Sequence, residues 1–177
     1  NGAYRDWLRG APFDGDRFLR RVERAMKAGT PYLAVAPDLV AGGWRNLEFS
    51  LEWLPRLPHE WDWYLAVQDG MGLADVEAVV APFAGIFLGG TDRFKATAPH
   101  WAALAGRCGK RFHYARAGTL KKLLHARGCG ADSVDSALPI WKSERLLEYA
   151  RWWAHVTRHE QKRLWPPTVG APRPEEV

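Results

Sequence analysis

Five short apolar runs of strand length alternate along the chain with segments of helical spacing. The runs cover residues 31–40, 61–68, 85–88 and 111–115, and a small last one lies within 128–135. Parallel neighbouring strands need a crossover segment, which is usually a helix, so this alternation predicts parallel β/α units. Such units either open into a doubly wound sheet or close into a barrel.

Helical spacing and capping residues predict the segments between these runs. The first helix is expected to begin at Asp14 or Asp16 and to run to Met26, because an acidic residue there can cap the first turn. Further helices are predicted over residues 44–54, 73–80, 91–104, 120–126 and 143–163. Residues 1–163 are therefore expected to form one domain, and the Pro-rich residues 164–177 an extended tail.

The length of 177 residues limits what this domain can be. It supports a sizeable core but falls short of the roughly 250 residues of a complete eight-unit barrel. We therefore expect an α/β fold of parallel strands that is either an open sheet or a barrel with fewer than eight units. The chain has no 18-residue apolar run and no leader-like segment, so we expect no membrane contact and a cytoplasmic location.

Positive charge is concentrated in the second half of the chain. Residues 107–163 hold 13 Lys and Arg but 5 Asp and Glu, whereas residues 1–106 hold 11 and 13. A concentrated basic surface attracts polyanions such as nucleic acid, although a solvated basic face without a ligand explains the charge equally well. The ten Trp residues are expected mainly in the core, with Trp44 and Trp141 near a pocket.

The residues that follow the predicted strands at their carboxyl ends are of types suited to ligand binding and catalysis. Ligands of both barrels and open α/β sheets bind at these ends. The residues found there are Asp38 with Gly42-Gly43, Gln68-Asp69-Gly70, Gly89-Gly90-Thr91, the segment 113–118, and Asp132 to Ser136. Together they predict a pocket for a flat, hydrogen-bonding ligand and for acid/base or nucleophilic chemistry.

Each of these residues also has a purely structural interpretation. Asp38 can cap the loop that follows it, His113 can be a buried core residue, and Lys95 is most simply a surface residue. The sequence has neither a phosphate loop nor a dinucleotide glycine fingerprint. Two cysteines are too few for a disulfide framework or a four-ligand zinc site, and His155 with His159 is a weak metal motif. No metal and no cofactor is predicted.

Taken in order, the strand ends resemble the tRNA-guanine transglycosylase superfamily. The resemblance is closest to its short phage and bacterial members linked to 7-deazaguanine insertion in DNA. It rests on NGAY at 1–4, APD at 36–38, AVQDGM at 66–71, FLGGT at 87–91 followed by Lys95, and HYARAGTLKKLLHARGCGADSVDS at 113–136. The resemblance covers most of the chain, from Asn1 to about Trp153. It implies a partial or compact (β/α) TIM-type barrel of parallel strands, with further strands upstream of Asn1.

The resemblance implies an enzyme that replaces guanine in nucleic acid with a 7-deazaguanine. Asp135 would be the nucleophile of a covalent glycosyl-enzyme intermediate. The substrate-binding residues would be Asp38, Gln68, Asp69, Gly89, Gly90 and His113, and Asp132 is a further second-layer candidate. The family's general acid/base is an Asp directly before the NGAY-like segment, so we expect one upstream of Asn1.

The resemblance also implies partners. The family's tRNA enzymes carry a zinc site of three Cys and one His, and the two cysteines here imply that this subdomain is absent, which favours DNA over tRNA. The residues expected to contact the nucleic-acid backbone are Lys95, Arg116, Lys121, Lys122, Lys142 and Arg145. A homo-oligomer or a partner subunit is also expected. Two alternatives remain: an N-glycosidase that only removes a base, and an inactive, basic, Trp-rich nucleic-acid-binding module.

Overall fold

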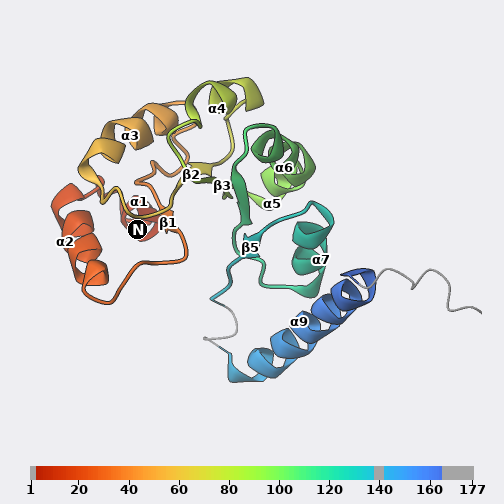
Figure 1. Ribbon diagram of the computed structural model, residues 1–177. Coiled ribbons are helices and arrows are strands. Elements are labelled where there is room, and N and C mark those ends of the chain that lie inside the picture. The colour runs from red at the N-terminus through yellow and green to blue at the C-terminus, as the bar shows by residue number, and fades with distance from the viewer. Residues whose placement is uncertain (1–2, 138–141, 165–177) are drawn as a thin grey trace, which may run out of the picture.

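A computed structural model, which describes residues 3–137 and 142–164, has five parallel strands in one curled sheet (Figure 1). The strands are β1 (Ala34–Val35), β2 (Trp63–Val67), β3 (Gly85–Leu88), β4 (Arg111–Tyr114) and β5 (Ser133–Val134). Their spatial order follows the chain, β1-β2-β3-β4-β5. Because this order never reverses, the sheet is not doubly wound. It is a half-barrel, compatible with a partial β/α barrel, and the predicted parallel β/α units are confirmed.

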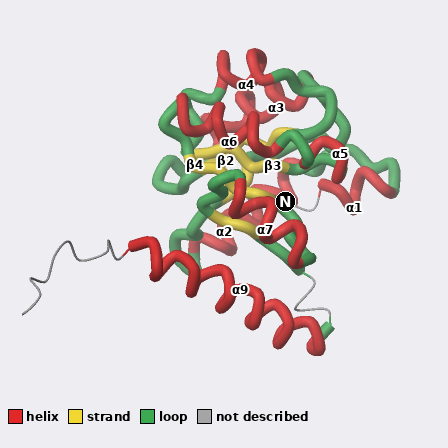
Figure 2. The backbone as a smooth tube through the Cα atoms, turned by 90° about the vertical axis from the view of Figure 1, so that its right-hand side faces the viewer, coloured by secondary structure: helices red, strands yellow, loops and turns green. Residues whose placement is uncertain are grey.

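The main helices follow the convex side of this half-barrel, as Figure 1 shows. They are α2 (Gly15–Met26), α3 (Arg45–Trp53), α4 (Leu73–Val79), α6 (Ala98–Arg107) and α7 (Leu120–Gly128). A single turn of 3₁₀ helix, η1 (Leu54–Arg56), extends α3 and contains Pro55. The long α9 (Ser143–Leu164) packs against α7 and lies outside the ring of helices, as the turned view in Figure 2 also shows.

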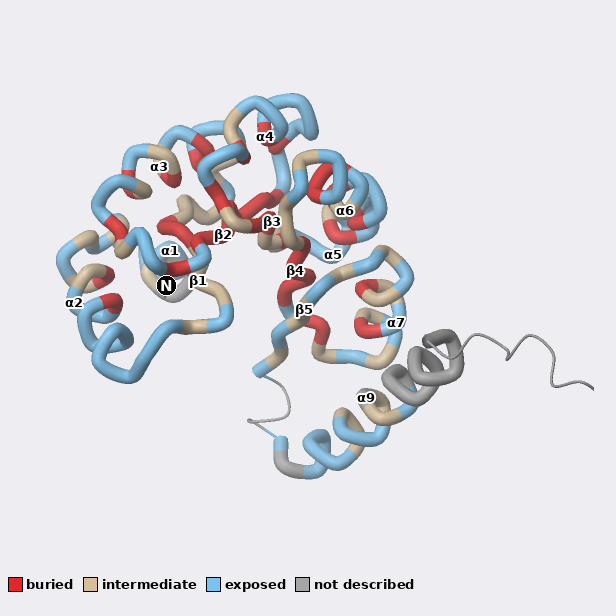
Figure 3. Tube along the Cα trace, viewed as in Figure 1, coloured by how far each residue is buried: buried red, intermediate tan, exposed pale blue. Residues whose placement is uncertain are grey.

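The core lies between the sheet and its helices. Side chains alternate across a strand, so Leu65 and Val67 point toward the helices while Tyr64 and Ala66 point toward the concave side. All five residues of β2 are buried, and Figure 3 shows burial concentrated along the strands. This burial on both faces explains why the strands appear in the sequence as continuous apolar runs. Four tryptophans belong to the core, as expected: Trp53, Trp61, Trp63 and Trp101.

Two predicted elements are wrong in extent. The first strand covers only Ala34–Val35 of the expected residues 31–40. The helix expected over residues 91–104 is two helices, α5 (Asp92–Lys95) and α6. Pro99 stands in the first turn of α6, where its missing N–H costs nothing, but within one continuous helix it would remove a backbone hydrogen bond.

Of the two helices nearest the N-terminus, one was predicted from the sequence and one was not. Asp14 caps α2 as predicted, because its Oδ1 accepts a hydrogen bond from the Arg17 backbone N–H at 2.9 Å. The short helix α1 (Ala3–Leu8) was not predicted. It is tied to α2 by an ion pair between Asp6 and Arg17. Across both described ranges, no helix combines the length and the apolar character that crossing a membrane requires.

Candidate active site

A cavity of about 170 Å³ opens at the carboxyl ends of β1, β2 and β3. Four of the predicted substrate-binding residues line it together: Asp38, Gln68, Gly89 and Gly90. The remaining lining residues are Val35, Ala66, Val67 and Phe87. These strands are neighbours in the sheet, so their carboxyl ends meet at one edge although they are far apart in the sequence. The structure therefore brings the three motifs together as the strand-end rule predicts.

Gln68 braces the loop that follows β1. Its Nε2 donates a hydrogen bond to the Leu39 carbonyl, and its Oε1 accepts one from the Ala41 N–H at 3.1 Å. A primary amide has two N–H donors and two acceptor lone pairs, so one of each is left for a ligand. Buried Asn46 holds the same loop, since it accepts from the Leu39 N–H and donates to the Ala66 carbonyl at 3.0 Å. Asn46 was missed in the sequence analysis.

Asp69 follows β2, as expected, and its carboxylate reaches the loop after β3. Its carboxylate accepts hydrogen bonds from the Thr91 N–H at 2.7 Å and the Thr91 hydroxyl at 2.6 Å, so it joins the ends of β2 and β3. Burial alone would raise the pKa of Asp69, but these two hydrogen bonds outweigh it and lower that pKa. Asp69 is not among the residues that line the cavity. The structure assigns it to holding the Gly89-Gly90 loop.

His113 connects the cavity to Asp135. The imidazole is 3% exposed and stacks on Phe87, with ring centres 4.8 Å apart and planes 7° apart. Its Nε2 lies 3.3 Å from Asp135 Oδ1, and its Nδ1 lies 2.8 Å from the Ser133 hydroxyl. An ionised carboxylate only accepts hydrogen bonds, so Nε2 carries the proton and Nδ1 accepts from Ser133. His113 is thus both a core residue and a partner of Asp135.

Asp135 follows β5 and has the properties of an ionised, accessible carboxylate. Its Oδ1 also accepts the Arg116 backbone N–H at 2.7 Å, while the side chain is 53% exposed. Burial would raise the pKa of Asp135, but the hydrogen bonds from His113 and Arg116, together with the charges of His113 and Lys95, outweigh it and hold that pKa below its usual value. Both of these hydrogen bonds are accepted by Oδ1, so neither of them occupies Oδ2.

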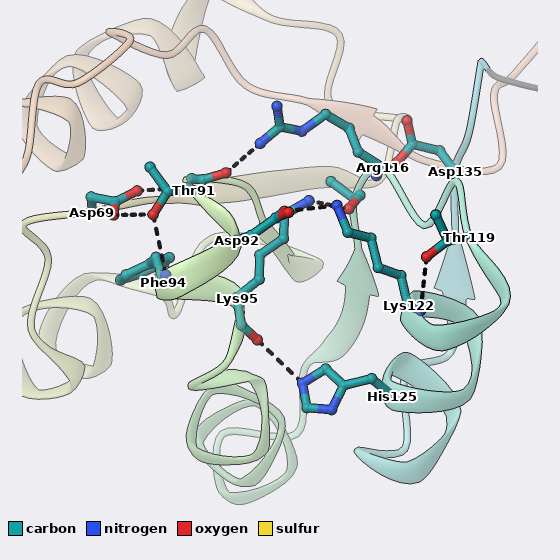
Figure 4. Close-up of polar contacts among 12 residues, drawn as sticks. Asp69, Thr91, Asp92, Phe94, Lys95, Arg116, Thr119, Lys122, His125 and Asp135 are labelled. Atoms are coloured by element: carbon teal, nitrogen blue, oxygen red, sulfur yellow. Dashed lines mark hydrogen bonds and ion pairs between the residues drawn. The ribbon is translucent and has the colours of Figure 1, made fainter.

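Lys95 corrects two expectations, that it lies on the surface and that it contacts a nucleic-acid backbone. It is 1% exposed, because α5 ends with this side chain turned toward β4. Its Nζ donates a hydrogen bond to the Ala115 carbonyl (Figure 4). The same Nζ lies 5.2 Å from the centre of the Tyr114 ring. Burial, with the positive charges of Arg116 and Lys122, lowers the pKa of Lys95 to about 8.

The other residues predicted to contact the nucleic-acid backbone differ in whether their charge is already paired within the protein. Lys121 and Lys142 are exposed. Lys122 forms an ion pair with Asp92 at 2.7 Å, and Arg145 pairs with Glu148 one turn along α9. The Arg116 guanidinium donates to the Gly90 carbonyl, so it also ties the end of β4 to the cavity loop (Figure 4).

Three further predictions have separate outcomes. The Asp132 carboxylate is engaged with the backbone of β4: its Oδ2 accepts the Phe112 N–H at 2.7 Å and fastens β4 to the segment before β5. Trp44 is 55% exposed and is not a lining residue of the cavity. Trp141 and the tail from residue 165 onward lie outside the described residues.

Metal ligands and comparisons with known proteins give no further assignment. Among the side chains that the structure describes, no three of His, Cys, Asp or Glu are grouped closely enough to hold a metal ion. No protein-family model, curated protein or solved structure matches the chain. The chemistry of this site must therefore be inferred from its own geometry.

Proposed function

We propose that this chain is a base-exchange transglycosylase, built on part of a TIM-type barrel, that replaces guanine in nucleic acid with a 7-deazaguanine. The observation that carries the proposal is an ionised, half-exposed Asp135 that His113 links, through its stack on Phe87, to a cavity with polar walls at the carboxyl ends of parallel strands. A carboxylate in that state is suited to attack an anomeric carbon, since the transition state there is oxocarbenium-like.

The cavity walls suit a flat purine. Asp38 would accept hydrogen bonds from N–H groups of the base, and the remaining N–H and lone pair of Gln68 would pair with its edge. Gly89 and Gly90 present bare backbone, which allows a planar ligand to approach closely. Phe87, held by its stack on His113, would form the apolar part of the wall.

The proposed reaction is two successive displacements at C1′. Asp135 Oδ2 attacks C1′, a C–O bond forms, and the bond from C1′ to guanine N9 breaks with its electron pair leaving on the base, which takes up a proton from a general acid. N9 of the incoming 7-deazaguanine then attacks C1′, loses its proton, and releases the Asp135 carboxylate. Two inversions retain the anomeric configuration.

The substrate is proposed to be DNA rather than tRNA, in a cytoplasmic setting. A paired guanine must leave the base stack to reach this cavity, at a cost of a few kcal/mol that contacts to the backbone offset. Exposed Lys121 and Lys142 would supply such contacts. We also propose that a second subunit, either another copy of this chain or a partner, completes the site.

Covalent trapping tests the assignment of Asp135. The protein is incubated with end-labelled, guanine-containing oligonucleotides, as single strands, duplexes and tRNA, and analysed by denaturing electrophoresis. We expect a shifted band that is absent in Asp135→Asn. Incorporation of a labelled 7-deazaguanine then identifies base exchange, whereas free guanine without incorporation identifies an N-glycosidase.

Asp132→Asn is the matched control, because it alters an acid three residues away whose Oδ2 accepts a backbone N–H. It is expected to keep the adduct. Binding without an adduct for any of the three substrates would instead support the inactive binding module. An adduct that survives in Asp135→Asn would assign the nucleophile to another residue.

A further inference from the structure

Lys95 and Asp135 are attached to opposite ends of one peptide group. The peptide between Ala115 and Arg116 presents its carbonyl oxygen to Lys95 Nζ and its N–H to Asp135 Oδ1, the latter at 2.7 Å. Both contacts are drawn in Figure 4. The Lys95 side chain is buried and the Asp135 side chain is half-exposed, so the peptide connects the interior to the candidate nucleophile.

This peptide lies at a backbone position that needs support. Arg116 has φ +56°, in the left-handed region that a residue with a side chain rarely adopts. The segment is held by backbone hydrogen bonds on both sides, from the Ala115 N–H to the Leu88 carbonyl at 3.2 Å and from the Ala117 N–H to the Asp135 carbonyl at 2.8 Å. Lys95 adds a third attachment, to the carbonyl next to the strained residue.

The surroundings of Lys95 do not give it an ion-pair partner in the described ranges. The carboxylates of Asp92 and Asp135 act on Lys95 through their charge, and the Asp92 carboxylate is bound by Lys122. Arg116 and Lys122 add positive charge around Lys95. The Tyr114 ring lies against the ammonium, and His125 contacts the backbone carbonyl of Lys95. A buried charge without a carboxylate partner is costly, so its retention here calls for a role.

We propose that Lys95 is a positioning residue for Asp135: its ammonium holds and polarises the Ala115–Arg116 peptide, and the polarised N–H fixes and stabilises the Asp135 carboxylate. Hydrogen bonds in series strengthen one another, because a donor at the carbonyl makes the N–H of the same peptide a better donor. Lys95 touches no substrate in this scheme. The inference rests on the proposed function only in taking Asp135 as the nucleophile.

The relay is tested first without any substrate, by carbon-detected NMR of the full chain. In the wild type, the carbonyl ¹³C shift of Ala115 is expected to follow an alkaline titration near pH 8, which is that of Lys95. In Lys95→Met the alkaline step disappears and the pKa of the Asp135 carboxyl rises. An Ala115 carbonyl that ignores the alkaline titration in the wild type overturns the proposal, even if the variant fails to fold.

Lys122→Met separates the relay from general electrostatics. Lys122 also carries a positive charge near Lys95. Its ammonium pairs with Asp92 and its backbone N–H donates to the Thr119 hydroxyl, so its hydrogen bonds go to groups other than this peptide. A rise in the pKa of Asp135 that is as large in Lys122→Met as in Lys95→Met overturns the relay. Lys95→Arg, which can still donate to the carbonyl, is expected to recover part of the effect.

Adduct formation then gives the functional readout. We expect the maximal rate of adduct formation in Lys95→Met to fall by about tenfold, with the oligonucleotide concentration for half-maximal rate unchanged, as for a group that acts only on the reacting carboxylate. A change confined to that concentration contradicts the positioning role. If the wild type forms no adduct but the NMR shifts are observed, the proposed function fails and the relay stands.

Discussion

At Gly90, backbone conformation and space both exclude a side chain. The residue has φ +74°, and a Cβ there would lie 2.6 Å from Asp69 Oδ2 and 2.8 Å from the Phe94 ring. The Asp69 carboxylate cannot give way without losing its hydrogen bonds to Thr91. The conformation of the cavity loop therefore depends on this one residue.

Replacement of Gly90 by Ala is expected to destabilise the protein by about 2 kcal/mol, the usual scale of a positive-φ strain combined with a close contact. Gly106→Ala is the matched control, because Gly106 lies in α6 and has nothing within 4 Å of the added Cβ. That variant should gain about 0.5–1 kcal/mol. Denaturant unfolding measures both, and equal effects of the two substitutions would contradict this account.

Lys95 makes the stability of the protein depend on alkaline pH. Its pKa is about 8 in the folded chain against 10.5 for an ordinary lysine, because burial penalises the charged form. Between these values the folded state binds fewer protons than the unfolded state, so stability rises with pH across the window. From pH 7 to 9.5 the gain relative to Lys95→Met is expected to be about 2 kcal/mol.

The measurement is a series of urea unfolding curves of both proteins over that pH range. Taking the difference between them removes the titrations of groups common to both, including Tyr64 and Tyr114, whose pKa values burial raises. A difference that stays constant with pH would show that Lys95 titrates as an ordinary lysine.

Among the elements, the loop between β1 and α3 depends on residues from the neighbouring strand and helix. Gln68 at the end of β2 and Asn46 in α3 bind its backbone at Leu39 and Ala41. The loop also contains Asp38, one of the proposed base-reading residues. The amide of Gln68 thus has two assignments, one to the loop and one to the proposed substrate.

Gln68→Ala distinguishes these assignments. If the amide braces the loop, hydrogen exchange at the Ala41 N–H, which Gln68 accepts at 3.1 Å, should become about tenfold faster without substrate present. Leu65→Ala, a core truncation in the same strand, controls for general loss of stability. Unchanged exchange at Ala41 in Gln68→Ala would leave base reading as the only role of the amide.

Element boundaries show where sequence patterns were sufficient. Asp14 caps α2 through a local hydrogen bond, and this start could be predicted because the cap and its partner are three residues apart. The single helix predicted over residues 91–104 failed since Pro99 sits at a start rather than an interior position. Lys95 was wrongly predicted to lie on the surface. In a helix as short as α5, packing against the neighbouring strand β4 decides which side chain is buried.

Across the whole molecule, the excess of positive charge is only partly available to a polyanion. In α7, Lys121 is exposed whereas Lys122 pairs with Asp92. Each phosphate contact contributes about one to the slope of log K against log salt. The two adjacent lysines are therefore expected to differ in their contribution to binding.

Lys121→Gln should reduce that slope by about one, and Lys122→Gln should reduce it less, because Asp92 already neutralises part of its charge. Fluorescence anisotropy with a guanine-containing duplex, over a range of salt concentrations, gives the slopes. Lys27→Gln, an exposed residue just after α2, is the control. Slopes that are equal for Lys121→Gln and Lys27→Gln would remove α7 from the proposed interface.

The sequence by itself determined the parallel β/α units, since hydrophobic periodicity and local caps depend on residues close together in the chain. It also indicated that Asp38, Gln68 and Gly89-Gly90 follow strands, and a parallel sheet brings such ends together. Only the tertiary structure decided that Asp69 holds a loop, that Lys95 is buried and that His113 and Arg116 both bind Asp135. Those assignments depend on contacts between residues about 20 positions apart, which local sequence patterns do not encode and which the packing of neighbouring strands brings together.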